Sequence, residues 1–306
     1  MKKVLVCDRI EIGELKLGNQ FVVDYKPTIE REELINSVNN YDVIVVRSRT
    51  KVDSKLIDRA KSLKLVARVG TGLDNIDVEY ASKRGIAVVN SPEALVEAVC
   101  EHTILLMLSL CRNVVDAVNS TLSGKWEKDR FYGTELKGKT LGVAGLGRIG
   151  KRVAQIARCF GMDIKVYDVI TLPKDTIEML SAEVLQLDEL LPISDFVTIH
   201  VPLTKETYHM LDEKRIRTMK RGSYLINTSR GSVIEEKALI EALQSGSLAG
   251  AALDVFESEP PSEQLRRAPN VLLTPHIAGQ TKEAQRLAVS IIAEKIRNYF
   301  NTAQQA

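Results

Sequence analysis

The chain has 306 residues, 44% of them apolar and 27% charged, a size and composition typical of a globular protein with two domains. Its 42 basic and 40 acidic side chains give a net charge of +2, which provides no bulk field to attract nucleic acid or a membrane. The four cysteines show no CxxC or metal-ligand spacing, so we expect no metal site and a reduced, cytoplasmic setting.

The first 90 residues alternate between strand-like and helix-like patterns. The opening MKKVLVCD predicts a strand rather than a signal peptide, whose apolar region is longer. Strands are predicted at Val4–Cys7, Phe21–Asp24, Val43–Val46, Leu65–Val69 and Ala87–Val89, and helices at Ile29–Val38, Ser54–Lys61 and Val78–Lys83. Such alternation is typical of a parallel sheet covered by helices, so this segment predicts an α/β unit of its own.

A long apolar helix is predicted next. Ser91, Pro92 and Glu93 are typical of a helix start, and the apolar pattern continues from Ala94 to about Val118. Its longest uncharged stretch, residues 103–111, is too short to span a bilayer. A helix that is apolar on most faces must be buried, either in a core or against another subunit. We favour the second alternative, because the helix lies between two α/β units.

The stretch Lys139–Asp168 has the features of a dinucleotide-binding turn. It contains a strand (Leu141–Ala144), the spacing G-x-G-x-x-G, an amphipathic helix and a second strand (Ile164–Tyr167). Gly145 allows the tight turn, Gly147 allows a pyrophosphate to approach, and Gly150 allows close helix–strand packing. Asp168 is placed to bond an adenosine ribose, and no Lys or Arg occurs in residues 169–173, which favours NAD over NADP.

A second α/β unit continues beyond this turn. Strands are predicted at Phe196–His200, Tyr224–Asn227, Ala251–Leu253 and Val271–Leu273, and helices near Asp188–Leu191, Glu213–Met219 and Glu235–Ser245. Thr281–Phe300 predicts an amphipathic helix that follows the completed second unit. We expect this helix to return to the first unit, which makes that domain discontinuous in sequence.

Three reactive side chains follow predicted strands of the second unit. Arg230 lies in NTSRG, Glu259 in DVFESEP and His276 in TPHIAG. The carboxyl ends of parallel strands meet at one edge, so these residues are expected to converge. A ketone that accepts a hydride needs a proton donor for its oxygen, and a histidine held by a carboxylate suits that role. The planar fork of an arginine matches a carboxylate. Taken singly, each has an ordinary alternative as a surface, turn or loop residue.

Other polar residues leave two interpretations open. The loop RVGTGLDNID (68–77) could hold a carboxylate on its N–H groups or be a structural turn. Arg47 and Arg49 in RSRT could bind a phosphate or carboxylate or lie in solvent. His102 is interpreted as a satisfied buried histidine, and His200 as part of the cofactor-site wall.

The motifs GLGRIG with Asp168, HVPLT, NTSRG, DVFESEP and TPHIAG, preceded by GTGLDNID, occur in this order. With them the chain resembles the D-isomer-specific 2-hydroxyacid dehydrogenases over essentially its whole length. RSRT and VGTGLDNID are most similar to the family's phosphoglycerate dehydrogenases. The resemblance implies an NAD-binding Rossmann domain (93–279) inserted in a flavodoxin-like substrate domain (1–92 and 280–306), both doubly wound parallel sheets, and a homodimer formed through the helix near 93–118.

The resemblance also implies residue roles. Arg230 resembles the substrate-orienting arginine, His276 the general acid/base and Glu259 its carboxylate partner. The substrate is expected to contact Arg47, Arg49, Gly70, Thr71 and Gly72. The residues expected at the NAD site are Gly145, Gly147, Arg148, Ile149, Gly150, Asp168, His200, Pro202, Thr207, Thr228, Ser229, Asp254 and Gly279.

The expected reaction is NAD-dependent oxidation of 3-phospho-D-glycerate to 3-phosphohydroxypyruvate in serine biosynthesis. A glyoxylate or hydroxypyruvate reductase of the same family is the alternative. An NAD-sensing binding module, similar to the family's transcriptional co-repressors, is an alternative of another class. Many phosphoglycerate dehydrogenases carry a C-terminal regulatory domain that binds serine. Because the sequence ends at Ala306, just past the last predicted helix, we expect no such domain here.

Overall fold

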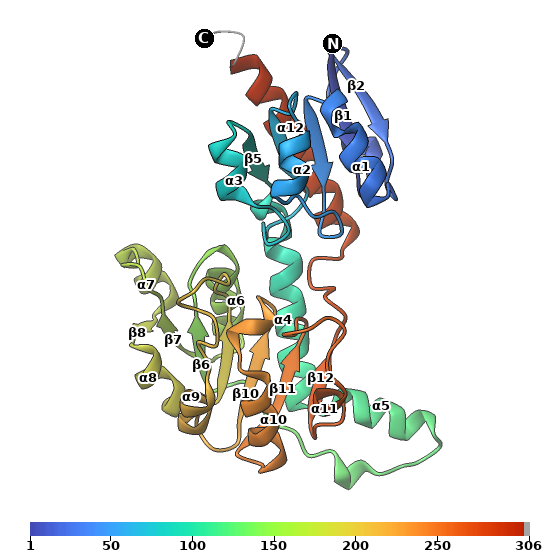
Figure 1. Ribbon diagram of the computed structural model, residues 1–306. Helices are drawn as coiled ribbons and strands as arrows, with labels where there is room; N and C mark the ends of the chain where they lie inside the picture. Colours follow the sequence, from blue (N-terminus) through green and yellow to red (C-terminus); the bar gives the residue numbers. More distant parts are fainter. Residues whose placement is uncertain (303–306) are drawn as a thin grey trace. The chain divides into compact units, whose positions relative to one another are not determined.

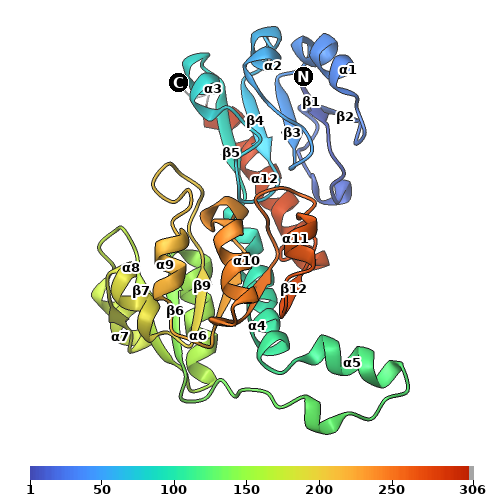
Figure 2. The ribbon, with the colours of Figure 1, turned by 60° about the horizontal axis from the view of Figure 1, so that its bottom comes forward.

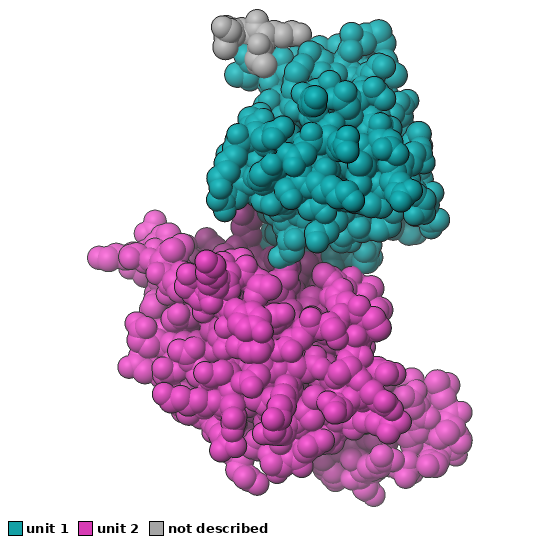
Figure 3. Space-filling model, in the orientation of Figure 1, with its two compact units in different colours: residues 1–96, 279–306 teal, residues 97–278 magenta. Residues whose placement is uncertain are grey.

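The predicted strands form two separate parallel sheets in the computed structural model, which describes residues 1–302 (Figure 1). The chain divides into unit 1, made of residues 1–96 and the C-terminal segment from residue 279, and unit 2, made of residues 97–278 (Figure 3). The α/β class with parallel sheets is therefore confirmed for both units.

Unit 1 contains a five-stranded sheet in the order β2-β1-β3-β4-β5. Its strands are β1 (Lys2–Val6), β2 (Phe21–Tyr25), β3 (Val43–Val46), β4 (Leu65–Arg68) and β5 (Ala87–Asn90). Its helices are α1 (Arg31–Ser37), α2 (Ser54–Arg59), α3 (Val78–Lys83) and α12 (Lys282–Thr302), with 3₁₀ turns η1 (Ile12–Glu14), η2 (Val38–Asn40) and η3 (Pro92–Leu95).

The two faces of this sheet are covered by different helices. Val4 and Val6 on β1 pack in a cluster with α12, while Leu5 between them packs with α1 and α2. Alternate side chains of a strand point to opposite faces, so the continuous apolar run is buried on both sides. The C-terminal helix therefore supplies one of the two apolar layers of unit 1.

Unit 2 contains a seven-stranded sheet in the order β12-β11-β10-β9-β6-β7-β8. Its strands are β6 (Thr140–Ala144), β7 (Asp163–Tyr167), β8 (Glu183–Val184), β9 (Phe196–Ile199), β10 (Ser223–Asn227), β11 (Leu248–Leu253) and β12 (Val271–Leu273). The strand order reverses at β6, where the chain turns from β6–β7–β8 to strands on the other side. Doubly wound sheets bind ligands at the carboxyl ends of strands at such a reversal.

Helices cover both faces of the unit 2 sheet (Figure 2). One layer contains α8 (Leu187–Leu190), α9 (Glu213–Thr218), α10 (Glu236–Gln244) and α11 (Glu263–Arg266), and the other α4 (Val96–Cys111), α6 (Arg148–Cys159) and α7 (Lys174–Leu180). The unit also contains α5 (Val114–Leu122) and 3₁₀ turns η4 (Lys128–Arg130), η5 (Leu191–Ile193) and η6 (Gly231–Val233). The sequence does not predict the short elements α7, β8 and α11, because a segment of two to seven residues is too short to show a clear periodicity.

The single helix predicted to about Val118 is wrong, because the chain breaks it into α4 and α5. Asn113 has a left-handed φ of 51°, which ends the regular helix between the two. Asparagine adopts that conformation more readily than most residues.

By length and composition Pro92–Cys111 is long and apolar enough to cross a membrane, with a mean hydropathy of 1.7. The uncharged stretch 103–111 is by itself too short to do so. More than half of Pro92–Cys111 is buried inside the structure. The packing of α4 in the apolar cluster beneath the unit 2 sheet accounts for its apolar character.

Candidate functional site

The turn from β6 to α6 has the backbone that a dinucleotide requires. Gly145 has a φ of +94°, and a Cβ there would lie 2.8 Å from the carbonyl carbon of His200. A Cβ on Gly150 would lie 2.0 Å from the carbonyl oxygen of Gly145. By contrast, a Cβ on Gly147 would have no other heavy atom within 4 Å. The two outer glycines are fixed by packing, and Gly147 keeps the start of α6 accessible to an anion.

Asp168 joins the end of β7 to this turn. Its Oδ2 accepts a 2.7 Å hydrogen bond from the N–H of Leu146, and its Oδ1 accepts one of 3.2 Å from Ile170. The carboxylate is half-buried beside the glycine turn. The turn, the N-terminus of α6 and this carboxylate together fit the pyrophosphate and ribose of NAD. Arg148 and Ile149, in the first turn of α6, are exposed and half-buried respectively.

The segment after β9 contains three residues predicted at the cofactor site. The Nε2 of His200 lies 2.9 Å from Oγ1 of Thr198, and burial lowers the pKa of His200 to about 3. That imidazole is therefore neutral at physiological pH, as suits a wall rather than a proton carrier. The buried hydroxyl of Thr207 donates to the carbonyl of Pro202 at 2.6 Å, so it shapes the loop from within.

The NTSRG turn after β10 is organised by Asn227, whose role no sequence pattern indicates. Its buried Oδ1 accepts hydrogen bonds from the N–H and hydroxyl of Ser229, and its Nδ2 donates to the carbonyl of Arg230. A Cβ on Gly231 would lie 1.9 Å from the carbonyl of Phe256, so the turn packs directly on the segment after β11. Arg230 Nη1 donates to the carbonyl of Ser229 at 2.7 Å.

His276 and Glu259 are brought together as predicted, 17 residues apart in sequence. The Nδ1 of His276 lies 2.9 Å from Oε1 of Glu259. Their side chains are 51% and 49% exposed, so the pair is accessible to a ligand. With Nδ1 bonded to the carboxylate, Nε2 of the ring remains the nitrogen that can exchange a proton with a substrate.

Asp254 and Thr228, two of the residues expected at the NAD site, are buried. Asp254 is 0% exposed, and its carboxylate accepts hydrogen bonds from the loop that contains His276. The hydroxyl of Thr228 lies 3.0 Å from that of Thr103 on α4. Gly279 belongs to unit 1, where a Cβ would lie 3.3 Å from Leu95. Their cofactor contacts stay predictions.

In unit 1 the two arginines of RSRT have different contacts. Arg49 Nε donates to Oδ1 of the buried Asp8 at 2.9 Å, and its other nitrogens donate to backbone carbonyls, including that of Cys7. Arg47 has only long side-chain contacts of 3.3 and 3.5 Å, to the carbonyl of Arg9 and to Gln280. Asp8 also accepts from the N–H of Arg47, so it is the organiser of this loop that the sequence did not reveal.

The glycine-rich loop after β4 is anchored by the buried side chain of Ser91. The N–H of Gly70 donates to Oγ of Ser91 at 2.9 Å, and the N–H of Ser91 donates back to the carbonyl of Gly70. Gly70 therefore has its N–H engaged within the protein. Thr71 and Gly72, both half-buried, are the members of this loop left for a carboxylate.

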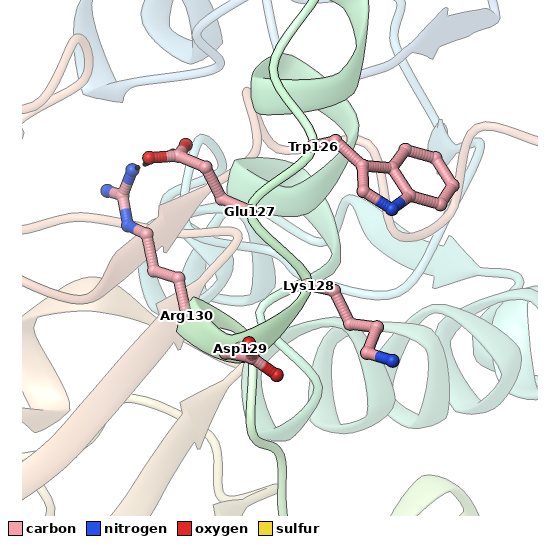
Figure 4. Close-up of a pocket in the computed structure, with 5 residues that line it drawn as sticks. All are labelled: Trp126, Glu127, Lys128, Asp129 and Arg130. Carbon is pink, nitrogen blue, oxygen red and sulfur yellow. Dashed lines mark hydrogen bonds and ion pairs between the residues drawn. The ribbon is translucent and has the colours of Figure 1, made fainter.

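A hollow elsewhere in unit 2 is lined by residues 126–130 (Figure 4). Trp126 and Lys128 point away from Glu127 and Arg130, which form an ion pair of 3.3 Å. None of the residues predicted from the sequence lines it. Within residues 1–302, no cluster of three His, Cys, Asp or Glu side chains could hold a metal ion.

Comparison with known proteins finds one matching family profile, described as "D-isomer specific 2-hydroxyacid dehydrogenase, NAD binding domain", over residues 104–278. The chain is 44% identical over 300 residues to the D-3-phosphoglycerate dehydrogenase of Methanocaldococcus jannaschii, covering 97% of this chain and 57% of that protein. It is 45% identical over 272 residues to the hydroxypyruvate reductase of Thermotoga maritima, covering 88% of each.

Among solved structures, the D-lactate dehydrogenase of Aquifex aeolicus complexed with NAD and lactic acid superposes with a TM-score of 0.87 at 31% identity. That match covers 99% of this chain and 96% of the other. The chain spans little more than half the length of the phosphoglycerate dehydrogenases it matches. The family profile falls inside unit 2, which identifies that unit as the NAD-binding one.

Proposed function

The chain belongs to the D-isomer-specific 2-hydroxyacid dehydrogenases, and from this premise we propose that it oxidises 3-phospho-D-glycerate with NAD, as in serine biosynthesis. The observation that supports this chemistry is the accessible His276–Glu259 pair. Glu259 follows β11 and His276 follows β12, two neighbouring strands of the sheet whose strand β6 leads into the glycine turn. The four cysteines are free, which suits the reducing cytoplasm that we propose as its setting.

The residues of this chain perform the proton and binding steps. NAD, when bound, supplies the acceptor for the hydride that leaves C2 of the substrate. Neutral His276 removes the hydroxyl proton at Nε2, while its Nδ1–H donates to Glu259 and keeps the ring oriented. Arg230 binds the substrate carboxylate with two N–H groups of its planar fork. Residues 145–150 and Asp168 would hold the cofactor.

The choice of substrate rests on Arg47. Burial lowers the pKa of its guanidinium, and the Asp8 carboxylate opposes that change. Its side-chain partners are a carbonyl and an amide at long distance, so an anion would compensate its lost hydration better. A phosphate provides such an anion, and this favours a phosphorylated hydroxy acid. The comparable identity to a hydroxypyruvate reductase keeps glyoxylate or hydroxypyruvate as the alternative substrate.

We expect Arg47→Ala to lower kcat/KM for 3-phosphoglycerate and 3-phosphohydroxypyruvate by about 10- to 100-fold, the effect of losing hydrogen bonds to a charged group. Activity with glyoxylate and hydroxypyruvate should change little. Arg49→Ala should instead lower the melting temperature, because it leaves the buried Asp8 without its guanidinium partner. Steady-state kinetics and thermal unfolding measure the two effects, with the exposed Arg59→Ala as control.

The outcome assigns the substrate. A preference for glyoxylate or hydroxypyruvate that ignores Arg47 would exclude the phosphorylated acid and support the alternative. Binding of NADH without turnover of any D-2-hydroxy acid at alkaline pH would contradict the enzymatic proposal and favour an NAD-sensing binding module.

We also propose a homodimer, with its interface shifted from the one suggested by the sequence. Most of α4 is buried within unit 2, whereas apolar side chains on α5 and the segment after it are exposed. Leu122 is 81%, Trp126 86% and Tyr132 83% exposed. Figure 1 shows α5 extending away from the sheet of unit 2. Large exposed apolar side chains gathered on one segment are typical of an interface, and a second copy would cover them.

The variant Leu122→Asp/Trp126→Asp is expected to halve the mass measured by light scattering, because a buried unpaired carboxylate is incompatible with an apolar interface. Val184→Asp, at an exposed position on β8, is the control and should keep the wild-type mass. A double variant with unchanged mass would place the interface elsewhere or show that the wild type is a monomer.

A further inference from the structure

A chain of hydrogen bonds runs from α4 to the loop that contains His276. The Nε2 of His102 lies 3.1 Å from Oγ1 of Thr274, and that hydroxyl donates to Oδ1 of Asp254 at 2.6 Å. The Asp254 carboxylate in turn accepts hydrogen bonds of 2.8 Å from the N–H groups of Ile277 and Ala278. All five residues belong to unit 2.

The direction of each bond follows from the groups involved. An ionised carboxylate accepts hydrogen bonds and donates none, so the single hydroxyl hydrogen of Thr274 goes to Asp254. His102 must therefore donate to Thr274, which places a hydrogen on Nε2 of His102. Since Asp254 is fully buried, its oxygens depend on these protein donors.

The loop held by this network contains a strained residue. His276 has a φ of +55°, in the left-handed region that residues other than glycine rarely adopt. Its N–H donates to the carbonyl of Thr274 at 2.9 Å, and the two residues after it are bonded to Asp254. Strained backbone of this kind persists where the surrounding structure over-determines it. The backbone on both sides of His276 is thus tied to Thr274 and Asp254.

We propose that Thr274 and His102 are positioning residues for His276, acting through Asp254. They fix the carboxylate, the carboxylate fixes the backbone of residues 277–278, and that backbone sets the direction of the His276 ring toward Glu259. The inference rests on the proposed role of His276 in proton transfer. It predicts that a hydroxyl which touches no substrate affects kcat more than KM.

The matched pair Thr274→Val and Thr274→Ser tests the hydroxyl, since valine keeps the shape and serine keeps the hydrogen bond. We expect Thr274→Val to lower kcat by about 10- to 100-fold, as a displaced catalytic group does, with KM changing less than kcat. Thr274→Ser should recover most of the lost kcat. Likewise, His102→Gln, which retains an N–H donor, should have a higher kcat than His102→Leu.

A second measurement does not depend on turnover. Amide hydrogen exchange in the peptide that covers residues 274–280 should be faster in Thr274→Val than in wild type or Thr274→Ser, because the bonds to Ile277 and Ala278 are loosened. Equal kcat and equal exchange in the valine and serine variants would overturn the proposal. If the wild type turns over no hydroxy acid, the proposed function fails, while the exchange data still decide whether the network holds the loop.

Discussion

His276→Ala is expected to lower kcat for hydroxy-acid oxidation by about 10²- to 10⁴-fold, the range that general acid–base groups contribute. In the proposed mechanism His276 takes the hydroxyl proton, and the hydrogen bond from its Nδ1 to Glu259 leaves Nε2 directed at the substrate. Alanine removes this proton acceptor. Reduction of the keto acid should fall by a similar factor, because the same ring returns the proton in that direction. Steady-state kinetics in both directions measure the two losses.

His209 offers a matched control for this experiment. It also has a left-handed φ, of 48°, and its Nε2 lies 2.7 Å from Oε1 of Glu257. Local geometry alone therefore resembles that of the proposed catalytic pair, but His209 lies after β9, outside the TPHIAG loop. His209→Ala should keep kcat within about threefold, as substitutions outside the transition-state contacts do. If His209→Ala lost activity and His276→Ala did not, the assignment would be wrong.

Arg230→Lys is expected to lower kcat/KM by about 10²- to 10³-fold, because lysine keeps the charge but loses the planar fork that bonds both carboxylate oxygens. Isothermal titration of the variant with NADH should give wild-type affinity, since the loss concerns the hydroxy acid. Steady-state kinetics with D-2-hydroxy acids measure the loss of kcat/KM. The corresponding 1,2-diols, which lack the carboxylate, are the control substrates.

The comparison arginine is Arg217, which pairs with Glu213 on the exposed surface of α9. Arg217→Lys should have wild-type kinetics, because exposed ion pairs of this kind contribute little. Equal activity of Arg230→Lys and Arg217→Lys on the hydroxy acids would exclude carboxylate binding by Arg230.

Local sequence was sufficient for the regular parts of the fold. The β-branched run at Val43–Val46 is a strand with the predicted bounds, and the glycine spacing marks the β6–α6 turn. Sequence periodicity failed at Asn113, because an apolar pattern does not reveal a single left-handed residue that divides it into two helices. A buried strand is indicated by a run of adjacent apolar residues. The break between α4 and α5 depends on the φ angle of one residue, which the apolar pattern does not indicate.

The proposed site was predictable where chemistry is carried by reactive side chains at strand ends, as with Arg230 and His276. It was not predictable where buried polar groups position those side chains. Asn227 shapes the NTSRG turn and Asp8 engages Arg49, yet neither has a sequence pattern that reveals its partners. Such contacts arise from tertiary packing across many residues, which only the structure brings together.

The return of α12 to unit 1 determines the order in which the chain can fold during synthesis. Ala288, Ile292 and Ile296 complete one apolar layer of that sheet, but the ribosome makes them only after all of residues 97–278. The nascent first 96 residues therefore lack the α12 part of the apolar cluster on one face of β1, β3 and β4, while unit 2 already has every residue of its own core. Domains fold as units when their contacts become available. Unit 1, whose synthesis begins first, can consequently complete its core only after all of unit 2 has been synthesised.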